Sequence, residues 1–428
     1  MNIIRLATFI ERQFLQIRIG GLTTLIYKFK ILFIYLCNLP IFIFSIPIIL
    51  LIRFIRPWFL VRFGEIRSSR IGHFAGNVEL YLCERDAGIN KPSQQNIDIF
   101  YFSENVCNQQ LAKMWKRIIK IWPSWIIKPF AQVNNFIPGG ELHAIGNNEM
   151  NDQDVHSLTE QFPCHLIFSD EENERGEEEL LAMGIPKGDQ FVCLIVRDSA
   201  YLDGPAWAYH NYRDSDINNY VLAAKYLADQ GYFVIRMGAK VHSAMNVAHP
   251  RIIDYAANGM RNDFMDIYIG SKCFFCISTS TGWDAIPFIF RKPIAYVNLV
   301  PIGSLFAIRW VYLAITKHHI LRSENRELSL SEIFTSGVAF CGTSYGFESK
   351  DLQLMENTPE EIKDLAQEML ERLNGSLEAH EDDLEMQQRF WEKFPKTGRL
   401  SLRGKTLFPQ KRSLYGRAFL RNNQTWLN

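Results

Sequence analysis

The chain lacks an excess of charge of either sign. Its 428 residues include 46 Lys or Arg and 46 Asp or Glu. Nucleic-acid binders neutralise phosphates with a basic surface, so this balance gives no electrostatic support for that class. The charges are unevenly spread, however. Acidic residues gather between residues 170 and 179, and from Lys393 onward nine basic residues occur without an acidic one.

Cysteines in a metal-binding or disulfide pattern are also missing. The only close pair among the eight cysteines is Cys273 and Cys276, within the apolar run KCFFCIST. Residues three apart on a strand point to opposite faces, so a shared metal or disulfide is not expected. We expect buried, reduced cysteines, which suit a reducing cytosol. The DSD stretch, residues 214–216, is interpreted as a helix start with Ser215 or Asp216 as N-cap rather than as a metal-binding carboxylate pair. The sequence therefore predicts no metal and no cofactor.

A long uncharged run lies near the start of the sequence, and we expect it to stay in the mature protein rather than to be removed as a signal peptide. Residues 31–52, ILFIYLCNLPIFIFSIPIILLI, are long enough for a hydrocarbon core of roughly 30 Å and have no small-residue cleavage site. Basic residues flank the run on both sides, and Pro40 and Pro47 interrupt it, which favours a helical hairpin that re-enters one leaflet over a span. The alternative is a buried hairpin of a soluble protein.

The residues before this run are typical of an interfacial helix. Apolar side chains recur at helical spacing while arginines fall elsewhere on the wheel; the apolar positions are Ile3, Ala7, Ile10 and Phe14. The sequence thus predicts a membrane surface as partner, with both ends of the membrane segment in the cytoplasm.

The remaining chain shows no internal repeat, and its pattern of apolar residues predicts an α/β fold. Apolar strands alternate with helices after residue 186, as in a parallel, doubly wound sheet. We expect four regions: a membrane segment (1–56), an N-terminal α/β domain (57–180), a C-terminal Rossmann-like domain (186–345), and a final helix with a basic tail (346–428). ENTPEEIKDLAQEMLERLNGS, residues 356–376, has a capping box at its start.

Polar residues follow three strands of the predicted sheet, where ligands of such sheets bind. Arg197 and Asp198 follow FVCLIV, and Arg236 and Gly238 close YFVIRMG. A hydroxyl-rich stretch follows CFFCIST and contains Ser278, Ser280, Thr281 and Gly282. Arginines and free backbone N–H groups at a helix start are suited to a diphosphate, which predicts a donor-binding site.

Each of these residues also has a purely structural interpretation. Arg197 can pair with a nearby carboxylate, whereas Arg236 lies within an apolar strand and needs a partner there. Thr281 and Asp284 have capping-box spacing, which is sufficient to begin a helix at Trp283 without any ligand.

The loop RFGEIRSSRIGHFAGN, residues 62–77, is the candidate for the acceptor side. His73 lies at a helix start and is a candidate general base, and Glu79 is a second catalytic candidate. Arg67, Arg70 and Asn77 are the candidate acceptor-side contacts. Taken alone, His73 is also a common kind of capping or surface histidine.

Together, FVCLIVRDSAYL, YHNYRDSDINNYVLAAKYLADQGYFVIRMG and DIYIGSKCFFCISTSTGWDAIPFIFRKPIAYVN resemble a family of bacterial glycosyltransferases found with surface-polysaccharide genes. The order of motifs is more loosely similar to the donor domain of GT-B fucosyltransferases. The resemblance covers most of residues 57–345. It implies a GT-B architecture of two Rossmann-like domains facing across a cleft, with the nucleotide-sugar in the C-terminal one and His73 facing the cleft.

The sequence thus predicts an enzyme, a metal-independent glycosyltransferase. It would move a sugar from a nucleotide diphosphate donor to a surface glycan or lipid-linked acceptor, and its expected location is the cytoplasmic face of the bacterial inner membrane. The alternatives are a nucleotide-sugar epimerase on the same scaffold and a non-catalytic polysaccharide-assembly protein.

Overall fold

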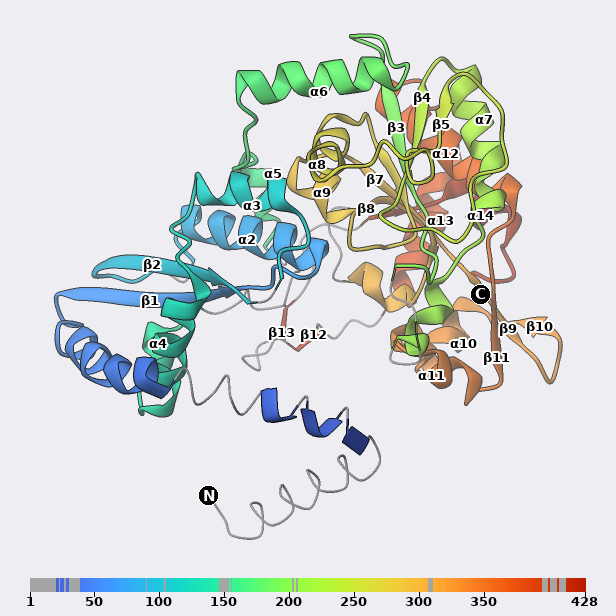
Figure 1. Ribbon diagram of the computed structural model, residues 1–428. Coiled ribbons are helices and arrows are strands. Elements are labelled where there is room, and N and C mark those ends of the chain that lie inside the picture. Colours follow the sequence, from blue (N-terminus) through green and yellow to red (C-terminus); the bar gives the residue numbers. More distant parts are fainter. Residues whose placement is uncertain are drawn as a thin grey trace. The chain divides into compact units, whose positions relative to one another are not determined.

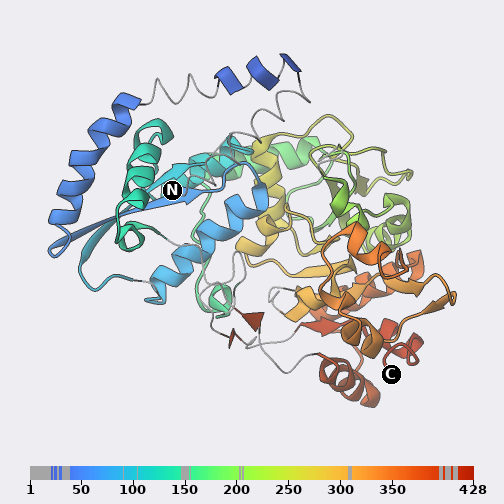
Figure 2. The ribbon, with the colours of Figure 1, turned by 90° about the horizontal axis from the view of Figure 1, so that it is seen from below.

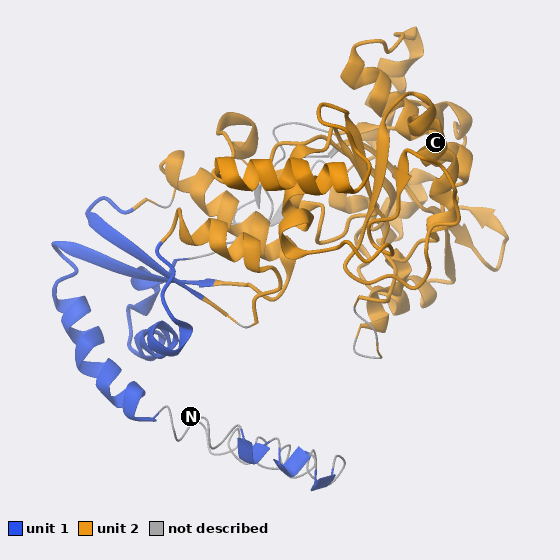
Figure 3. Ribbon diagram, turned by 45° about the horizontal axis from the view of Figure 1, so that its top comes forward, with its two compact units in different colours: residues 1–65, 92–101, 120–145 blue, residues 66–91, 102–119, 146–428 orange. Residues whose placement is uncertain are grey.

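The computed structural model describes residues 21–22, 24–26, 28–30, 39–89, 91–103, 105–145, 154, 156–201, 204, 207–306, 311–394, 399–400, 406–407 and 413–428. The interfacial helix predicted from Ile3 to Phe14 lies outside these residues. The described chain forms two compact units (Figure 3). Unit 1 comprises residues 1–65, 92–101 and 120–145, and unit 2 comprises residues 66–91, 102–119 and 146–428.

Unit 1 is a small sheet covered by helices. Strand β1 (Phe59–Ile66) pairs with β2 (Gln95–Phe102), and parallel bridges extend this sheet at Ala144 beside Phe63 and at Ile121 beside Phe100. The helix over residues 39–54 lies beside α4 (Ser124–Phe136), as Figures 1 and 2 both show. Both helices contribute to the apolar core that lies against the sheet.

The described part of the uncharged run lies in a single helix, and the hairpin over residues 31–52 stays a prediction. Residues 31–38 lie outside the description, and residues 39–54 are helical throughout, including Pro47. Pro47 is exposed, so its ring disturbs no packing on the buried side. Within the described residues, no helix has both the length and the apolar character that a membrane crossing requires.

Unit 2 contains a seven-stranded sheet in the order β14-β8-β7-β6-β3-β4-β5, and every pairing in it is parallel. Its strands are β3 (Phe191–Ile195), β4 (Phe233–Met237), β5 (Ile252–Ile253), β6 (Cys276–Ser278), β7 (Ile294–Leu299), β8 (Val311–Thr316) and β14 (Leu414–Tyr415). From β3 the chain adds strands first on one side and then on the other, so the predicted doubly wound parallel sheet is confirmed. The switch point, where ligands bind in such sheets, lies between β3 and β6.

The described helices of unit 2 are labelled in Figure 1 where there is room. They are α2 (Ile71–Asp86), α3 (Gln109–Lys116), α5 (Leu158–Gln161), α6 (Asp170–Ala182), α7 (Val221–Asp229), α8 (Asp263–Lys272), α9 (Ala285–Ile289), α10 (Leu330–Thr335), α11 (Ser344–Glu348), α12 (Pro359–Asn374), α13 (Glu381–Glu392) and α14 (Arg417–Asn422). A smaller sheet joins β9 (His318–Leu321) to β10 (Arg326–Glu327) and β11 (Leu352–Met355), and β12 (Arg399–Leu400) pairs with β13 (Thr406–Leu407). The capping box of α12 is confirmed, with Thr358 and Glu361 as its partners.

Two helices group with a different part of the chain than the sequence suggested. We expected α2 and α3 in the first α/β domain, yet both belong to unit 2, where α2 packs on α9 and α3 packs on α8. The predicted domain limits remain a prediction. The packing nevertheless brings the start of α2 to the sheet that carries the candidate donor residues.

A candidate anion-binding site at the switch point

The ends of β3 and β6 are joined directly by a hydrogen bond. The backbone N–H of Arg197 donates to the Thr279 hydroxyl at 2.8 Å, and the Thr279 N–H donates to the carbonyl of Ile195 at 3.2 Å. Arg197 therefore leaves the sheet beside the hydroxyl-rich loop, at the switch point. The structure brings together these two features, which are 82 residues apart in the sequence.

A second arginine approaches this loop from a 3₁₀ helix (Ala208–Arg213). The Arg213 guanidinium donates to the carbonyl of Ser280. Ser280 has a φ of 60°, in the left-handed region, so the loop turns sharply at that residue. Next in the chain, Asp214 places Oδ1 at 3.2 Å from Arg197 Nε, and its carbonyl accepts from Lys317 Nζ at 2.5 Å.

The start of α2 lies against the same loop. A Cβ at Gly72 would come within 3.0 Å of the Gly282 carbonyl oxygen, which is too close for an ordinary contact. A side chain at Gly72 would therefore require the backbone to shift, whereas a Cβ at Gly282 would make only ordinary contacts, the nearest at 3.5 Å. Just before Gly72, Arg70 holds its guanidinium 4.9 Å from the ring centre of Trp207, at cation–π distance.

The charges at this site are predominantly positive. Burial lowers the pKa of Arg197, and the neighbouring Arg213 lowers it further. Burial also lowers the pKa of His210, with added repulsion from Arg213, Arg197 and Arg70. Burial raises the pKa of Asp214 against the opposing effect of Arg197. A bound anion would relieve the repulsion among these cations.

Several polar atoms here are buried without a protein partner. His210 Nδ1, Arg213 Nε and Thr281 Oγ1 have no hydrogen-bond partner within the described residues. A buried donor or acceptor left without a partner costs roughly 1–3 kcal/mol. Their gathering around one loop is therefore a reason to expect a polar ligand.

The observed start of the helix after this loop differs from the predicted one. Thr281 and Asp284 form no capping box; α9 begins at Ala285, has only five residues, and Asp284 caps it without a side-chain hydrogen bond. The Asp284 carboxylate instead accepts from the Ser278 hydroxyl at 2.7 Å, and Ser278 Oγ accepts from the Ser280 N–H at 3.0 Å. Burial raises the pKa of Asp284 to about 6. So short a helix has a weak dipole, and the cations contribute most of the positive field.

The other donor-side candidates are engaged elsewhere. Asp198 accepts from the backbone N–H groups of Ala200 and His242, at 2.9 and 3.0 Å. Arg236 is 2% exposed and donates through Nη1 to Asp254 at 3.0 Å and to the Ser243 carbonyl at 2.7 Å. A Cβ at Gly238 would meet Val241 at 2.9 Å, so this glycine has a packing role. Donor contact by these three residues remains a prediction.

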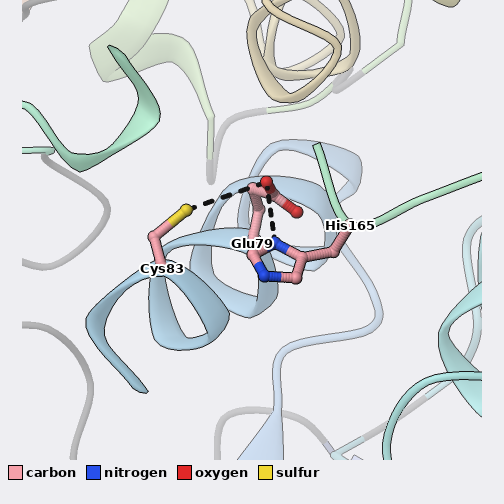
Figure 4. A group of neighbouring side chains, drawn as sticks. All are labelled: Glu79, Cys83 and His165. Carbon is pink, nitrogen blue, oxygen red and sulfur yellow. Dashed lines mark hydrogen bonds and ion pairs between the residues drawn. The ribbon is translucent and has the colours of Figure 1, made fainter. Parts of the chain in front are cut away.

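Glu79 is fully buried among charged partners. Its Oε1 accepts from Arg291 at 2.6 Å and lies 3.1 Å from His165 Nδ1. Figure 4 shows Glu79 with Cys83, one turn further along α2, and with His165. A carboxylate in this position is not open to a substrate, and we do not carry Glu79 into the proposed catalytic machinery.

The same cluster has the residue types of a metal site. One atom from each of Glu79, Cys83 and His165 lies within 4.8 Å of the others. However, the Arg291 guanidinium is 3.6 Å from the Cys83 sulfur and bonded to Glu79, so a cation is already present. Burial raises the pKa of the Cys83 thiol to about 12, which keeps it a protonated, poor ligand. We interpret the cluster as a structural ion pair.

The remaining acceptor-side candidates lie at the start of α2. His73 is half-buried in its first turn, and Arg67 and Arg70 are exposed just before it. The side-chain oxygen of Asn77 is buried without a hydrogen-bond partner within the described residues. Their roles toward an acceptor remain predictions.

The sequence pointed to the excursion after β3, which contains His210 and Arg213, without giving either residue a role, and it missed Asp214 and Lys317 as site residues. Asp214 directly follows Arg213, in the DSD stretch that was interpreted as a helix start. That interpretation holds for Asp216, which accepts from the Asn218 N–H. Asp214, two residues earlier, faces Arg197 instead.

Comparisons with known proteins give weak likenesses only. No protein-family model and no curated protein matches the chain. Among solved structures, a family 9 glycosyl transferase from Veillonella parvula is 10% identical, with a TM-score of 0.36, over 55% of this chain and 80% of its own. An iron-containing dodecameric glycosyltransferase from enterotoxigenic E. coli is 10% identical, with a TM-score of 0.39, over 75% and 78%. A UDP-GlcNAc 2-epimerase from Neisseria meningitidis is 10% identical, with a TM-score of 0.29, over 74% and 100%. Likenesses of this size assign no function, and the assignment below depends on the site.

Proposed function

We propose that the protein is a GT-B-like glycosyltransferase that uses a nucleotide diphosphate sugar as donor. The observation that carries this proposal is the convergence of Arg70, Arg197 and Arg213 near the 278–282 loop at the switch point of a parallel sheet. The planar guanidinium group of arginine can donate two parallel hydrogen bonds to phosphate oxygens. The switch point is also where doubly wound sheets bind nucleotides.

The site is suited to a phosphate leaving group. When the bond between sugar and diphosphate breaks, negative charge grows on the leaving oxygen. Fixed cations already in place stabilise that charge without having to reorganise. Because arginines rather than paired free carboxylates dominate the site, we propose that this stabilisation does not require a metal.

His210 is the candidate general base within this site. Its lowered pKa keeps the imidazole neutral at pH 7, and its Nδ1 has no partner within the described residues. A neutral imidazole can take the proton of an acceptor hydroxyl as that hydroxyl attacks the sugar. Asp214 is suited to orienting a donor hydroxyl, because Arg197 engages only one of its oxygens.

We propose a surface glycan or a lipid-linked glycan as acceptor, following the sequence resemblance. The experiment incubates the full-length protein with a panel of nucleotide diphosphate sugars, with and without a glycolipid extract. Acceptor-dependent release of the nucleoside diphosphate supports the proposal. Isomerised donor without release would indicate an epimerase, and donor binding without either reaction would indicate a non-catalytic protein.

Variants link the activity to the site. Arg213→Gln removes a cation beside the loop, whereas Arg326→Gln removes an exposed arginine paired with Glu324 and Glu332. Losing a charged hydrogen bond costs about 1.5–3 kcal/mol, which is roughly ten- to more than a hundredfold in nucleotide affinity. If the two variants bind the nucleotide with equal affinity, Arg213 is not part of the nucleotide-binding site.

A further inference from the structure

The helix over residues 39–54 is apolar apart from Ser45 and Arg53. Its inward stripe includes Ser45 and Ile49, both with no exposed surface, and Ile49 belongs to one core with Val61 and Phe63 of β1 and Ile127 of α4. Arg53, near the end of the helix, donates to the carbonyls of Asn134, Ile137 and Pro138 around the end of α4. The helix is thus held firmly against unit 1 on one side.

The outward side of this helix is exposed among the described residues of unit 1. Eight large apolar side chains of the helix are each at least 41% exposed: Leu39, Ile43, Phe44, Ile46, Ile48, Leu50, Leu51 and Phe54. At 100° per residue they occupy more than half of the helix circumference, with no charged side chain between them. A contiguous apolar surface of this kind marks an interaction site.

Exposed aromatic side chains lie on the same unit. Trp58, just after the helix, is 69% exposed and contacts the Phe54 ring, with ring centres 6.2 Å apart. Trp122 and Trp125, at the start of α4, are 48% and 66% exposed. Tryptophan concentrates where hydrocarbon meets lipid headgroups, because its ring is apolar and its N–H is polar.

The charge of unit 1 complements an anionic surface. Its described part has seven basic residues, which are Lys28, Lys30, Arg53, Arg56, Arg62, Lys120 and Lys128. It has three acidic residues, Glu65, Asp98 and Glu141, and Asp98 is paired with Arg62. Each basic residue near an anionic bilayer adds roughly 1 kcal/mol of attraction.

We propose that unit 1 binds the surface of an anionic lipid bilayer, with the helix 39–54 lying in the plane of one leaflet. The buried stripe keeps the helix on the protein, so its outward apolar side enters the headgroup region to a limited depth. The tryptophans then lie at the interface, and basic residues other than Arg53 and Arg62, which are engaged within unit 1, meet lipid phosphates. The anionic cytoplasmic face of the bacterial inner membrane, which the sequence predicts as location, offers such lipids. This proposal does not depend on the proposed transferase reaction.

Flotation of the full-length protein with vesicles tests this proposal. We expect binding to vesicles of phosphatidylglycerol and phosphatidylcholine, and weaker binding to phosphatidylcholine alone. The double variant Phe44→Glu/Leu51→Glu places two charges on the outward side, and we expect at least a tenfold lower partition coefficient. The matched control is Leu384→Glu, because Leu384 is 82% exposed on α13 of unit 2.

Two further measurements interpret the result. Urea unfolding shows whether the double variant is folded, and a shift of tryptophan fluorescence to shorter wavelength on adding vesicles reports insertion in the unsubstituted protein. Failure of the unsubstituted protein to bind anionic vesicles, or equal binding by the folded double variant, would overturn the proposal. Light scattering that shows a dimer broken by the double variant, with vesicle binding unchanged, would assign the surface to a second copy instead.

Discussion

The Thr279 hydroxyl accepts the backbone N–H of Arg197 at 2.8 Å. This bond joins the ends of β3 and β6, the two strands from which the sheet grows in opposite directions. It therefore fixes where Arg197 leaves the sheet relative to the 278–282 loop. The Thr279 side chain, which is 2% exposed, thus holds Arg197 and the loop of the candidate phosphate site together.

Thr279→Val keeps the shape of the side chain and removes the acceptor. We expect stability to fall by about 1–3 kcal/mol, because the Arg197 N–H is then left without its partner. Nucleotide affinity should fall as well, since the loop and Arg197 are no longer held together. Urea unfolding and calorimetric titration with a nucleoside diphosphate measure the two effects. Thr335→Val, at an exposed hydroxyl that bonds its own helix, serves as control and should change neither.

Arg236→Met distinguishes a structural arginine from a donor-binding one. The substitution leaves the carboxylate of Asp254 without its buried partner, so we expect about 3 kcal/mol of destabilisation in urea unfolding. Arg236→Met/Asp254→Asn should recover part of that loss, because it removes both charges. If Arg236→Met instead unfolds like the unsubstituted protein but binds nucleotide poorly, the predicted donor contact is correct.

The parallel sheet could be predicted because its strands are short apolar runs. All five residues of β3 and all five of β4 are buried. Short buried strands that are separated by helices are compatible with few folds other than a parallel sheet covered on both faces. Arg197 and the hydroxyl-rich loop were recognisable for the same reason, since they directly follow such strands.

The rest of the site depends on tertiary packing. Nothing local shows that Asp214 faces Arg197 while Asp216 caps a helix, because both carboxylates suit a helix start. The place of α2 depends on its contact with α9, whereas adjacency in the sequence suggested β1 and β2. The run 31–52 was interpreted as a re-entrant hairpin from its prolines, and only packing shows that Ile49 belongs to a protein core.

His318 should make the stability of unit 2 depend on pH. Burial alone would lower the pKa of His318, but its bonds to Glu327 and Glu361, at 2.7 and 3.1 Å, outweigh burial and raise that pKa to about 10. The stabilisation is fully present below the unfolded pKa of about 6.5 and is lost as pH rises toward 10. We expect the free energy of unfolding to fall between pH 7 and 9.5, and His318→Gln to flatten that fall. His380→Gln, at the exposed start of α13, should leave it unchanged.

The pH dependence of turnover tests His210 against His73 as the general base. Burial and three arginines lower the pKa of His210, so its base form persists below pH 6.5. In the free enzyme, kcat/KM for the donor should therefore rise with pH along an acid limb whose midpoint is below 6.5, and be flat near pH 7. His210→Gln should lower kcat by about 10²–10⁴ and abolish the limb, because the group that titrates is gone. If His73→Gln abolishes the limb while His210→Gln preserves it, the base belongs to α2, and the role of His210 reduces to lining the phosphate site.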